Sequence, residues 1–132
     1  MRILFIDDNI KDFELLFRGI CARDCAGAEV HVADNGPEGL RKYEQVRPEL
    51  VVVDYQMPGM NGEEVARELR DRYGPVPNIA LFSGTVDWVT DRKLFDKIFS
   101  KDNPYALFNW LTAWSARAGK RLVYAAREMG GC

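Results

Sequence analysis

Short apolar runs alternate with amphipathic stretches along this chain. Residues 3–6 and 50–53 are apolar at every position and each run ends at an acidic residue, which is typical of strands buried on both faces of a sheet. Further strands are predicted at 28–33, 78–82 and 97–100. Because strand-length runs separated by helix-length segments favour βαβ units, we expect an α/β fold with a mostly parallel five-stranded sheet.

Residues between these strands repeat with helical spacing. Ile10, Phe13 and Phe17 share one face of a predicted helix over 10–23. Gly119 is expected to interrupt the last helix, leaving a short helix or a frayed tail after it. The other predicted helices are 37–45, 62–73, a short or partly unwound fourth helix at 86–94, and 104–116, followed by 120–129.

Length and charge narrow the class of protein. A chain of 132 residues fits one compact unit, which we place at 1–117, with 118–132 as a C-terminal extension or tail. With 47% hydrophobic residues, 29% charged residues and a net charge of -2, the composition is that of an ordinary soluble protein and not of a nucleic-acid binder. The first apolar run is too short for a signal peptide or a membrane span, so we expect a cytoplasmic protein without a membrane partner.

Cysteine and histidine offer little chemistry. Cys21, Cys25 and Cys132 are an odd number in a chain without a secretion signal, which favours reduced thiols. No second Cys/His pair completes a zinc site. His31 is the single histidine and is expected on a strand face, so catalysis should not depend on imidazole.

Polar residues stand where four of the predicted strands end. Asp7 and Asp8 follow the first strand, Asp54 the third, Ser83 the fourth and Lys101 the fifth. In a parallel sheet the carboxyl ends of the strands meet at one edge, where ligands bind. Each aspartate alone is more simply interpreted as a helix or turn cap. The joint pattern instead favours one shared site.

Clustered carboxylates repel one another unless a cation neutralises them, which implies a hard divalent ion. Mg²⁺ fits, because it accepts one or two carboxylates and leaves positions for phosphate oxygens. Lys101 and Ser83 are suited to contact the oxygens of a transferring phosphoryl group. Asp54 would be the carboxylate nucleophile, as in other aspartyl phosphates.

At these motifs the chain resembles the receiver domains of two-component response regulators, of the CheY-like superfamily, over about residues 2–116. Residues 5–9 resemble the family's acidic pair, 53–62 its phosphoacceptor loop, 82–84 its hydroxyl position and 99–101 its lysine. The resemblance implies a flavodoxin-like, doubly wound sheet of order 2-1-3-4-5 with helices on both faces. It also implies a phosphoacceptor signalling domain that promotes its own phosphorylation and dephosphorylation, rather than an enzyme in the usual sense.

The resemblance also assigns roles. Asp54 would accept a phosphoryl group from a histidine kinase or a phosphotransfer protein. Asp8, Asp54 and the backbone carbonyl of Gln56 would bind Mg²⁺, with Asp7 acting through water. Lys101 would pair with the phosphoryl group and Ser83 would be drawn to it. Gln56 and Thr85 would stand where the lifetime of the aspartyl phosphate is set.

Three features depart from the family pattern. Ile98 occupies the position of the usual aromatic switch residue, Asp102 and Asn103 intervene between Lys101 and Pro104, and the stretch from Ser83 to Lys101 is short by about one helical turn. These departures lie on the side through which receivers ordinarily signal. Trp88 and Trp110 are candidates for an apolar patch there, which would bind an unknown downstream protein.

The leading hypothesis is a single-domain response regulator, a monomer or weak dimer that signals through protein contacts and not through direct nucleic-acid binding. The alternative is an interaction module that uses the receiver fold without phosphorylation. A third hypothesis, a small aspartate-nucleophile phosphatase, is disfavoured because Gln56 stands where such enzymes place a second acid.

Overall fold

The central sheet is parallel throughout and has the strand order β2-β1-β3-β4-β5. The computed structural model describes residues 1–24 and 28–128, and for residues 24 and 118–128 the backbone alone. The strands are β1 (Arg2–Ile6), β2 (Glu29–Ala33), β3 (Leu50–Val53), β4 (Asn78–Ser83) and β5 (Lys97–Ser100). The predicted α/β class and strand order are confirmed. Cys25 and Cys132 lie outside the described residues.

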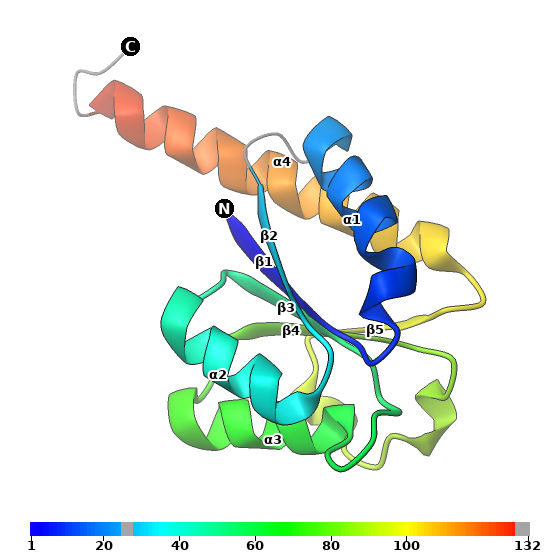
Figure 1. The fold of residues 1–132 in the computed structure, drawn as a ribbon. Helices are drawn as coiled ribbons and strands as arrows, with labels where there is room; N and C mark the ends of the chain where they lie inside the picture. Colours follow the sequence, from blue (N-terminus) through cyan, green and yellow to red (C-terminus); the bar gives the residue numbers. More distant parts are fainter. Residues whose placement is uncertain (25–27, 129–132) are drawn as a thin grey trace.

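Helices cover both faces of the sheet (Figure 1). α1 (Ile10–Asp24) and α4 (Pro104–Glu128) lie on one face, and α2 (Gly36–Val46) and α3 (Gly62–Tyr73) lie on the other. The fold is therefore doubly wound, with the sheet buried between two helical layers. This explains why the central strands are apolar at every position.

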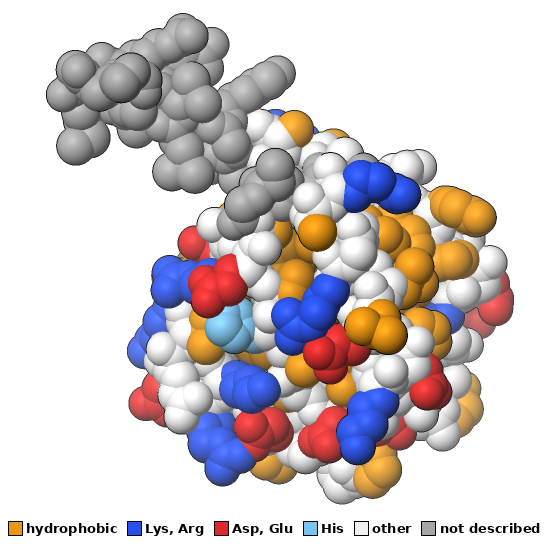
Figure 2. Space-filling model, turned by 45° about the horizontal axis from the view of Figure 1, so that its top comes forward, with side chains coloured by type: hydrophobic (Ala, Val, Ile, Leu, Met, Phe, Trp, Pro, Cys, Tyr) orange, Lys and Arg blue, Asp and Glu red, His pale blue; other side chains and the backbone are white. Residues whose placement is uncertain are grey.

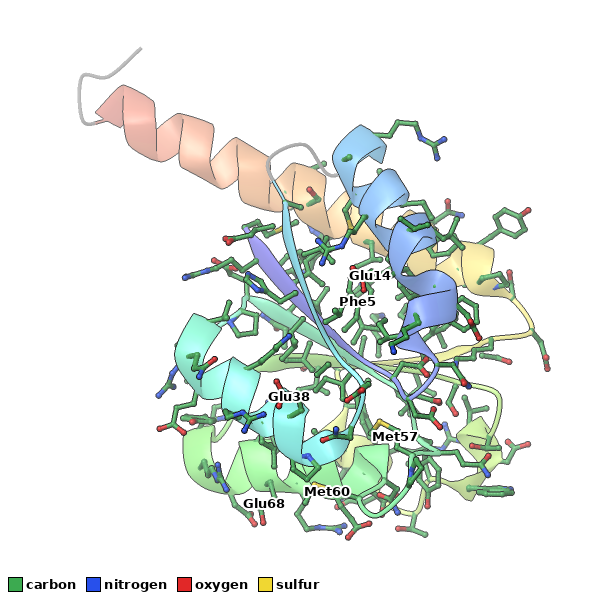
Figure 3. The ribbon with its side chains drawn as sticks, viewed as in Figure 1. Phe5, Glu14, Glu38, Met57, Met60 and Glu68 are labelled. Atoms are coloured by element: carbon green, nitrogen blue, oxygen red, sulfur yellow. The ribbon has the colours of Figure 1, made fainter. Side chains whose placement is uncertain are left out.

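Alternation along each strand divides the buried residues into two cores. In β1, Leu4 and Ile6 pack toward α2 and α3, whereas Ile3 and Phe5 pack toward α1 and α4. Figure 3 shows Phe5 on the α1 side of the sheet. The Phe5 ring stacks on that of Phe17, with ring centroids 4.3 Å apart. Each such fully buried side chain contributes about 1.5–3 kcal/mol, so β1 anchors both cores.

The start of α3 is fitted closely against the end of β3. Asn61 forms a capping box with Glu64, which fixes the first helical turn. The next residue is Gly62, and a Cβ atom there would lie 2.1 Å from the carbonyl oxygen of Asp54. Glycine at this position therefore allows the backbone of α3 to approach Asp54 directly.

Basic side chains protect the outer edge of β2. Arg18 donates to the carbonyl of Val30 at 3.0 Å, and Lys42 donates to the carbonyl of Val32. These contacts occupy acceptors that would otherwise invite another strand. Figure 2 shows charges of both signs interspersed around the single histidine, His31, which lies in β2 as expected. The face in that view carries no continuous basic surface of the kind that nucleic acids require.

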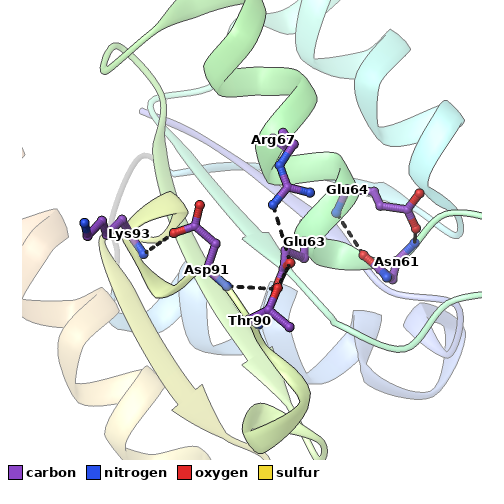
Figure 4. A network of polar contacts seen from close by, with 7 residues as sticks. All are labelled: Asn61, Glu63, Glu64, Arg67, Thr90, Asp91 and Lys93. Carbon is purple, nitrogen blue, oxygen red and sulfur yellow. Dashed lines mark hydrogen bonds and ion pairs between the residues drawn. The ribbon is translucent and has the colours of Figure 1, made fainter.

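The segment between β4 and β5 contains two 3₁₀ turns, η1 (Val86–Trp88) and η2 (Arg92–Leu94). The segment is shortened as expected, but the predicted short fourth α-helix is replaced by these two 3₁₀ turns. Glu63, at the start of α3, holds this segment in place (Figure 4). Its carboxylate accepts the Thr90 N–H at 2.6 Å, the Thr90 hydroxyl at 2.5 Å and the Asp91 N–H at 3.3 Å.

One boundary prediction was wrong. The last helix does not end near residue 116 but continues without a break through Gly119, and α4 runs from Pro104 to Glu128. A glycine inside a helix costs only about 1 kcal/mol relative to alanine. Good helix formers on both sides of Gly119, such as Ala118 and Lys120, offset that cost. Residues 120–128, where a separate short helix was predicted, are the end of this same helix.

We expect Glu63→Gln to lower the free energy of unfolding at pH 7 by about 1.5–3 kcal/mol, because it replaces a carboxylate that accepts several hydrogen bonds. Burial by itself raises the pKa of Glu63, but the bonds from Thr90 and Asp91 and the Arg67 charge outweigh it, and the pKa is lowered. A lowered pKa stabilises the fold above the unfolded-state pKa, and that stability is lost as the pH falls through the folded-state pKa. The variant should therefore lack this acid-sensitive part of the stability.

Chemical denaturation at several pH values measures both effects. Glu68→Gln is the matched control, because Glu68 is a partly exposed residue of the same helix, and among the described residues the ion pair it forms is with Arg72, at 3.3 Å. Exposed pairs of this kind contribute about 0–1 kcal/mol. Equal losses of stability in the two variants at pH 7 would contradict the role given to Glu63.

Candidate phosphoacceptor site

The strand ends bring the predicted residues to one edge of the sheet. Ile6 of β1 pairs with Val53 of β3, so the next residue on each strand, Asp7 and Asp54, stand at the same level. The Asp54 N–H donates to the Ile6 carbonyl at 2.9 Å, and the Lys101 N–H donates to the Ser83 carbonyl at 3.0 Å. The backbone hydrogen bonds thus extend one residue beyond the strands and fix the Cα positions of Asp54 and Lys101.

Three carboxylates cluster there. Ligand oxygens of Asp7, Asp8 and Asp54 all lie within 4.8 Å of one another. Asp7 and Asp54 are buried, at 5% and 6% exposure, whereas Asp8 is exposed. Oxygen donors in this number suit a hard divalent cation that keeps some of its own water. The residues present therefore fit a Mg²⁺ ion.

Lys101 reaches into this cluster from the end of β5. Its Nζ atom lies 2.8 Å from Oδ2 of Asp7 and 3.3 Å from Oδ2 of Asp54. The ammonium also lies over the rings of Phe13, at 5.3 Å, and Phe82, at 5.8 Å. Burial by itself lowers the pKa of Lys101, but its bonds and charge interactions with the two aspartates outweigh it and raise the pKa. Lys101 is therefore charged at neutral pH.

The surroundings of Asp54 disfavour its charged form. Burial raises its pKa and the neighbouring Asp7 charge adds to this, although the Ser83 hydroxyl and Lys101 partly offset both effects. It faces an open pocket of about 590 Å³, which Asp8, Gln56, Ser83 and Lys101 also line. Asp7 lies behind this pocket, against Lys101. A buried, accessible carboxylate beside a cation is suited to nucleophilic chemistry.

Ser83 lies at the end of β4 and is 1% exposed. Its Oγ atom accepts the N–H of Thr85 at 3.1 Å and shares a hydrogen bond with the Thr85 hydroxyl, also at 3.1 Å. The sequence pattern did not predict this contact. Its only signal was the spacing of Ser83 and Thr85, since a serine hydroxyl commonly binds the backbone two residues on.

The sequence model of the family described as response regulator receiver domain matches residues 3–97 of this chain. This chain belongs to the response regulator receiver domain family. The matched residues include Asp7, Asp8, Asp54 and Ser83 but end before Lys101. The position of Lys101 in the site therefore rests on the contacts of its side chain.

Relatives of the receiver domain agree with this assignment. This chain is 36% identical over 92 residues to the DNA-binding response regulator MtrA of Mycolicibacterium paratuberculosis. The match covers 67% of this chain and 38% of MtrA. It is 34% identical over 88 residues to the probable transcriptional regulatory protein SilR of Salmonella typhimurium, covering 66% of this chain and 37% of SilR. The match thus spans little more than a third of the length of these relatives.

Solved structures share the receiver fold. The response regulator TrrA of Thermotoga maritima, in complex with Mg²⁺ and BeF, superposes with a TM-score of 0.68 at 30% identity, covering 83% of this chain and 97% of TrrA. TrrA in complex with the histidine kinase ThkA superposes with a TM-score of 0.66 at the same identity and coverage. A receiver domain from Clostridium thermocellum reaches 0.72 at 21% identity and 92% coverage of this chain, which supports the fold alone.

Two departures from the receiver pattern have a structural explanation. Ile98 lies in β5 opposite Leu81 and packs on the core beneath α2 and α3. After Lys101 the chain turns through Asp102 and Asn103, whose N–H groups donate to the Ser100 hydroxyl and carbonyl at 3.1 Å each. These two residues therefore close the turn from which α4 begins.

Trp88 and Trp110, the two candidates for an apolar patch, do not lie together. Trp88 is 56% exposed and packs edge-to-face on Tyr55, with ring centroids 6.1 Å apart. Trp110 packs on Phe99, at 5.5 Å, within the core beneath α1 and α4. Because Tyr55 packs on the opposite core, the two rings contact different faces of the sheet.

Among the described residues, no helix is both long and apolar enough to span a membrane.

In a metal-free buffer at pH 7, we expect Asp54→Asn to raise the free energy of unfolding, by on the order of 1 kcal/mol. A carboxyl whose pKa is raised by folding binds more protons in the folded state, so its ionisation weakens the fold as the pH rises above the unfolded-state pKa. Below about pH 4 the two proteins should converge in stability. Thermal unfolding across this pH range measures the difference. Asp102→Asn, an exposed acid nearby, should show no such gain, and a destabilised Asp54→Asn would contradict the expectation.

Proposed function

We propose that this chain is the phosphoacceptor of a two-component pathway and that Asp54 receives the phosphoryl group. The observation that carries the proposal is the cluster at the sheet edge, where a buried nucleophile faces a pocket beside Lys101. The family membership agrees with it. A histidine kinase or a phosphotransfer protein is the proposed donor, by analogy with TrrA in its complex with the kinase ThkA.

In the transfer, an Asp54 carboxylate oxygen forms a bond to phosphorus while the bond from phosphorus to the donor breaks. The donor leaves with the bonding electrons, and no proton transfer to Asp54 is needed. Lys101 can follow the developing negative charge, because its ammonium already lies between Asp54 and Asp7. Ser83 supplies a hydroxyl for a phosphoryl oxygen. Positioning and charge neutralisation are thus the main contributions of this site.

Mg²⁺ is the proposed cofactor. Asp8, Asp54 and the backbone carbonyl of Gln56 would hold the ion, with Asp7 acting through water. When bound, the ion would neutralise the carboxylates and supply positive charge that stabilises the transferring phosphoryl group. The structure of TrrA in complex with Mg²⁺ and BeF supports this choice.

The proposal also covers the extent, the location and the output of the protein. We assign the receiver unit to residues 1–117 and an extension to 118–132, and we place the protein in the cytoplasm as a monomer or weak dimer. Gln56 lines the pocket at the position where an aspartate-nucleophile phosphatase needs an acid, which argues against turnover of phosphate esters. The output is proposed to be a protein contact that depends on the state of Asp54, with exposed Trp88 as the candidate contact.

Incubation with acetyl phosphate and Mg²⁺ should add one phosphoryl group to the intact protein, detected as a mass increase. Asp54→Asn should gain none, and Asp8→Asn should gain it more slowly by at least about tenfold, because one carboxylate for the metal is lost. Asp102→Asn should behave like the unchanged protein. If the unchanged protein gains no adduct from acetyl phosphate or phosphoramidate, the proposed function is wrong.

A second candidate is an interaction module that works without phosphorylation. Ile98 at the switch position and the segment 86–94, which lacks an α-helix, favour it. Both features alter the side of the fold through which receiver domains usually respond to phosphorylation. Beryllofluoride, a phosphoryl mimic, separates the two. Signalling by phosphorylation predicts altered amide hydrogen exchange in residues 85–95 when the mimic binds. An unchanged exchange pattern outside the pocket would favour the second candidate.

A further inference from the structure

The Lys101 ammonium lies over two aromatic rings as well as beside two carboxylates. Its Nζ atom is 5.3 Å from the ring centroid of Phe13 and 5.8 Å from that of Phe82. Both distances fall within the roughly 6 Å over which the face of an aromatic ring attracts a cation. The phosphoryl transfer proposed above uses the contacts of Lys101 with Asp7 and Asp54 and gives these rings no part.

The two rings come from different elements and rest on the same core residue. Phe13 lies in the first turn of α1 and is half-buried, whereas Phe82 lies in β4 directly before Ser83 and is buried. The centroid of the buried Phe17 ring is 6.1 Å from that of Phe13 and 6.2 Å from that of Phe82. Phe13 and Phe82 therefore form an aromatic seat for the ammonium that is fixed to the core between the sheet and α1.

The carboxylates and the aromatic seat hold Lys101 in different ways. The attraction to Asp7 and Asp54 depends on their negative charge, and a divalent cation bound to the carboxylate cluster neutralises much of that charge. A lysine side chain is long and flexible, so it gains rotamer freedom when its ammonium is released into water. The attraction by the ring faces does not depend on the carboxylate charge and persists when the cluster is neutralised.

We propose that Phe13 and Phe82 are positioning residues, which keep the Lys101 ammonium at the phosphoacceptor site while the carboxylates bind a divalent cation. The inference rests on the proposed function and adds to it a requirement for aromatic side chains at two positions outside the acidic cluster. Phe82 is enclosed in β4, where a substitution would disturb the sheet. Phe13 is the more exposed of the two, so the experiment is made at position 13.

The first measurement is the initial rate at which acetyl phosphate and Mg²⁺ add a phosphoryl group, followed by intact mass. Phe13→Leu keeps an apolar side chain but removes the ring face, and it should slow the transfer by about three- to tenfold. Phe13→Tyr keeps the ring face and should restore the rate to within about twofold of the unchanged protein. Phe13→Met is a second non-aromatic variant, for use if Phe13→Leu does not fold.

The second measurement is the order of the Lys101 ammonium, from ¹⁵N relaxation of its NH₃⁺ group with and without Mg²⁺. Without the metal, Asp7 and Asp54 should keep the ammonium ordered in every variant. With Mg²⁺, the ammonium should stay ordered in the unchanged protein and in Phe13→Tyr but become mobile in Phe13→Leu. A role of Phe13 in packing alone would leave this order unchanged.

Phe108→Leu is the matched control. Phe108 of α4 is also half-buried, and its ring centroid lies 6.1 Å from that of Phe17, the same separation as for Phe13. The substitution therefore removes a similar contact with Phe17 but leaves the aromatic seat in place. Both the rate of phosphorylation and the order of the Lys101 ammonium should match those of the unchanged protein.

The outcomes separate the aromatic seat from the proposed function. An unchanged rate in Phe13→Leu, or an ammonium that stays ordered in that variant with Mg²⁺, overturns the seat while phosphorylation of Asp54 stands. Equal slowing in Phe13→Tyr or in Phe108→Leu assigns the effect to packing and also overturns it. If the unchanged protein gains no phosphoryl mass, both proposals fall. Slower transfer together with a loss of order that requires Mg²⁺ supports the seat.

Discussion

Everything at this sheet edge depends on two buried carboxylates that lie next to each other. Asp7 and Asp54 are placed together by the level pairing of β1 and β3, because the backbone ladder fixes the Cα atoms of both residues. Two like charges about 4 Å apart repel by roughly 4 kcal/mol at an effective dielectric constant of about 20. The Lys101 ammonium contacts both and offsets this repulsion. The end of β5 thus stabilises the ends of β1 and β3.

This arrangement requires that β5, an edge strand, be held in register. Arg70 of α3 donates to the Leu94 carbonyl at 3.1 Å and pairs with Asp96 at 3.0 Å, while Asp96 accepts the N–H of Ile79 at 2.7 Å. The start of β5 is thereby tied to both α3 and β4. Its other end is fixed by the bond from Lys101 to Ser83. Polar contacts at both ends substitute for the second neighbouring strand that β5 lacks.

The sequence was sufficient for the sheet and for the gathering of Asp7, Asp54 and Lys101 at one edge, because both depend on local patterns. Apolar runs that end abruptly at Asp7 and Asp54 mark the strands and also the candidate site, since the residue that follows each strand belongs to the cluster of carboxylates. Lys101 could be placed because it follows a predicted fifth strand. The expected unwinding before β5 could be predicted as well, since the short segment at 86–94 leaves little room for an α-helix.

What could not be predicted depends on contacts between residues far apart in the sequence or on small local energies. Continuation of α4 through Gly119 is a matter of about 1 kcal/mol, which a glycine near a plausible end does not reveal. Trp88 and Trp110 were separated by the sheet itself, which spacing along the chain does not show. Glu63 accepts a hydrogen bond from Thr90, which is 27 residues away in the sequence, and no local sequence pattern predicts that contact. The members of the candidate site therefore stand at strand ends, where local sequence patterns show them. The conformation of residues 86–94 depends instead on contacts with side chains far away in the sequence, such as that between Glu63 and Thr90. The same set of residues at the strand ends is therefore compatible with different conformations of the segment between β4 and β5.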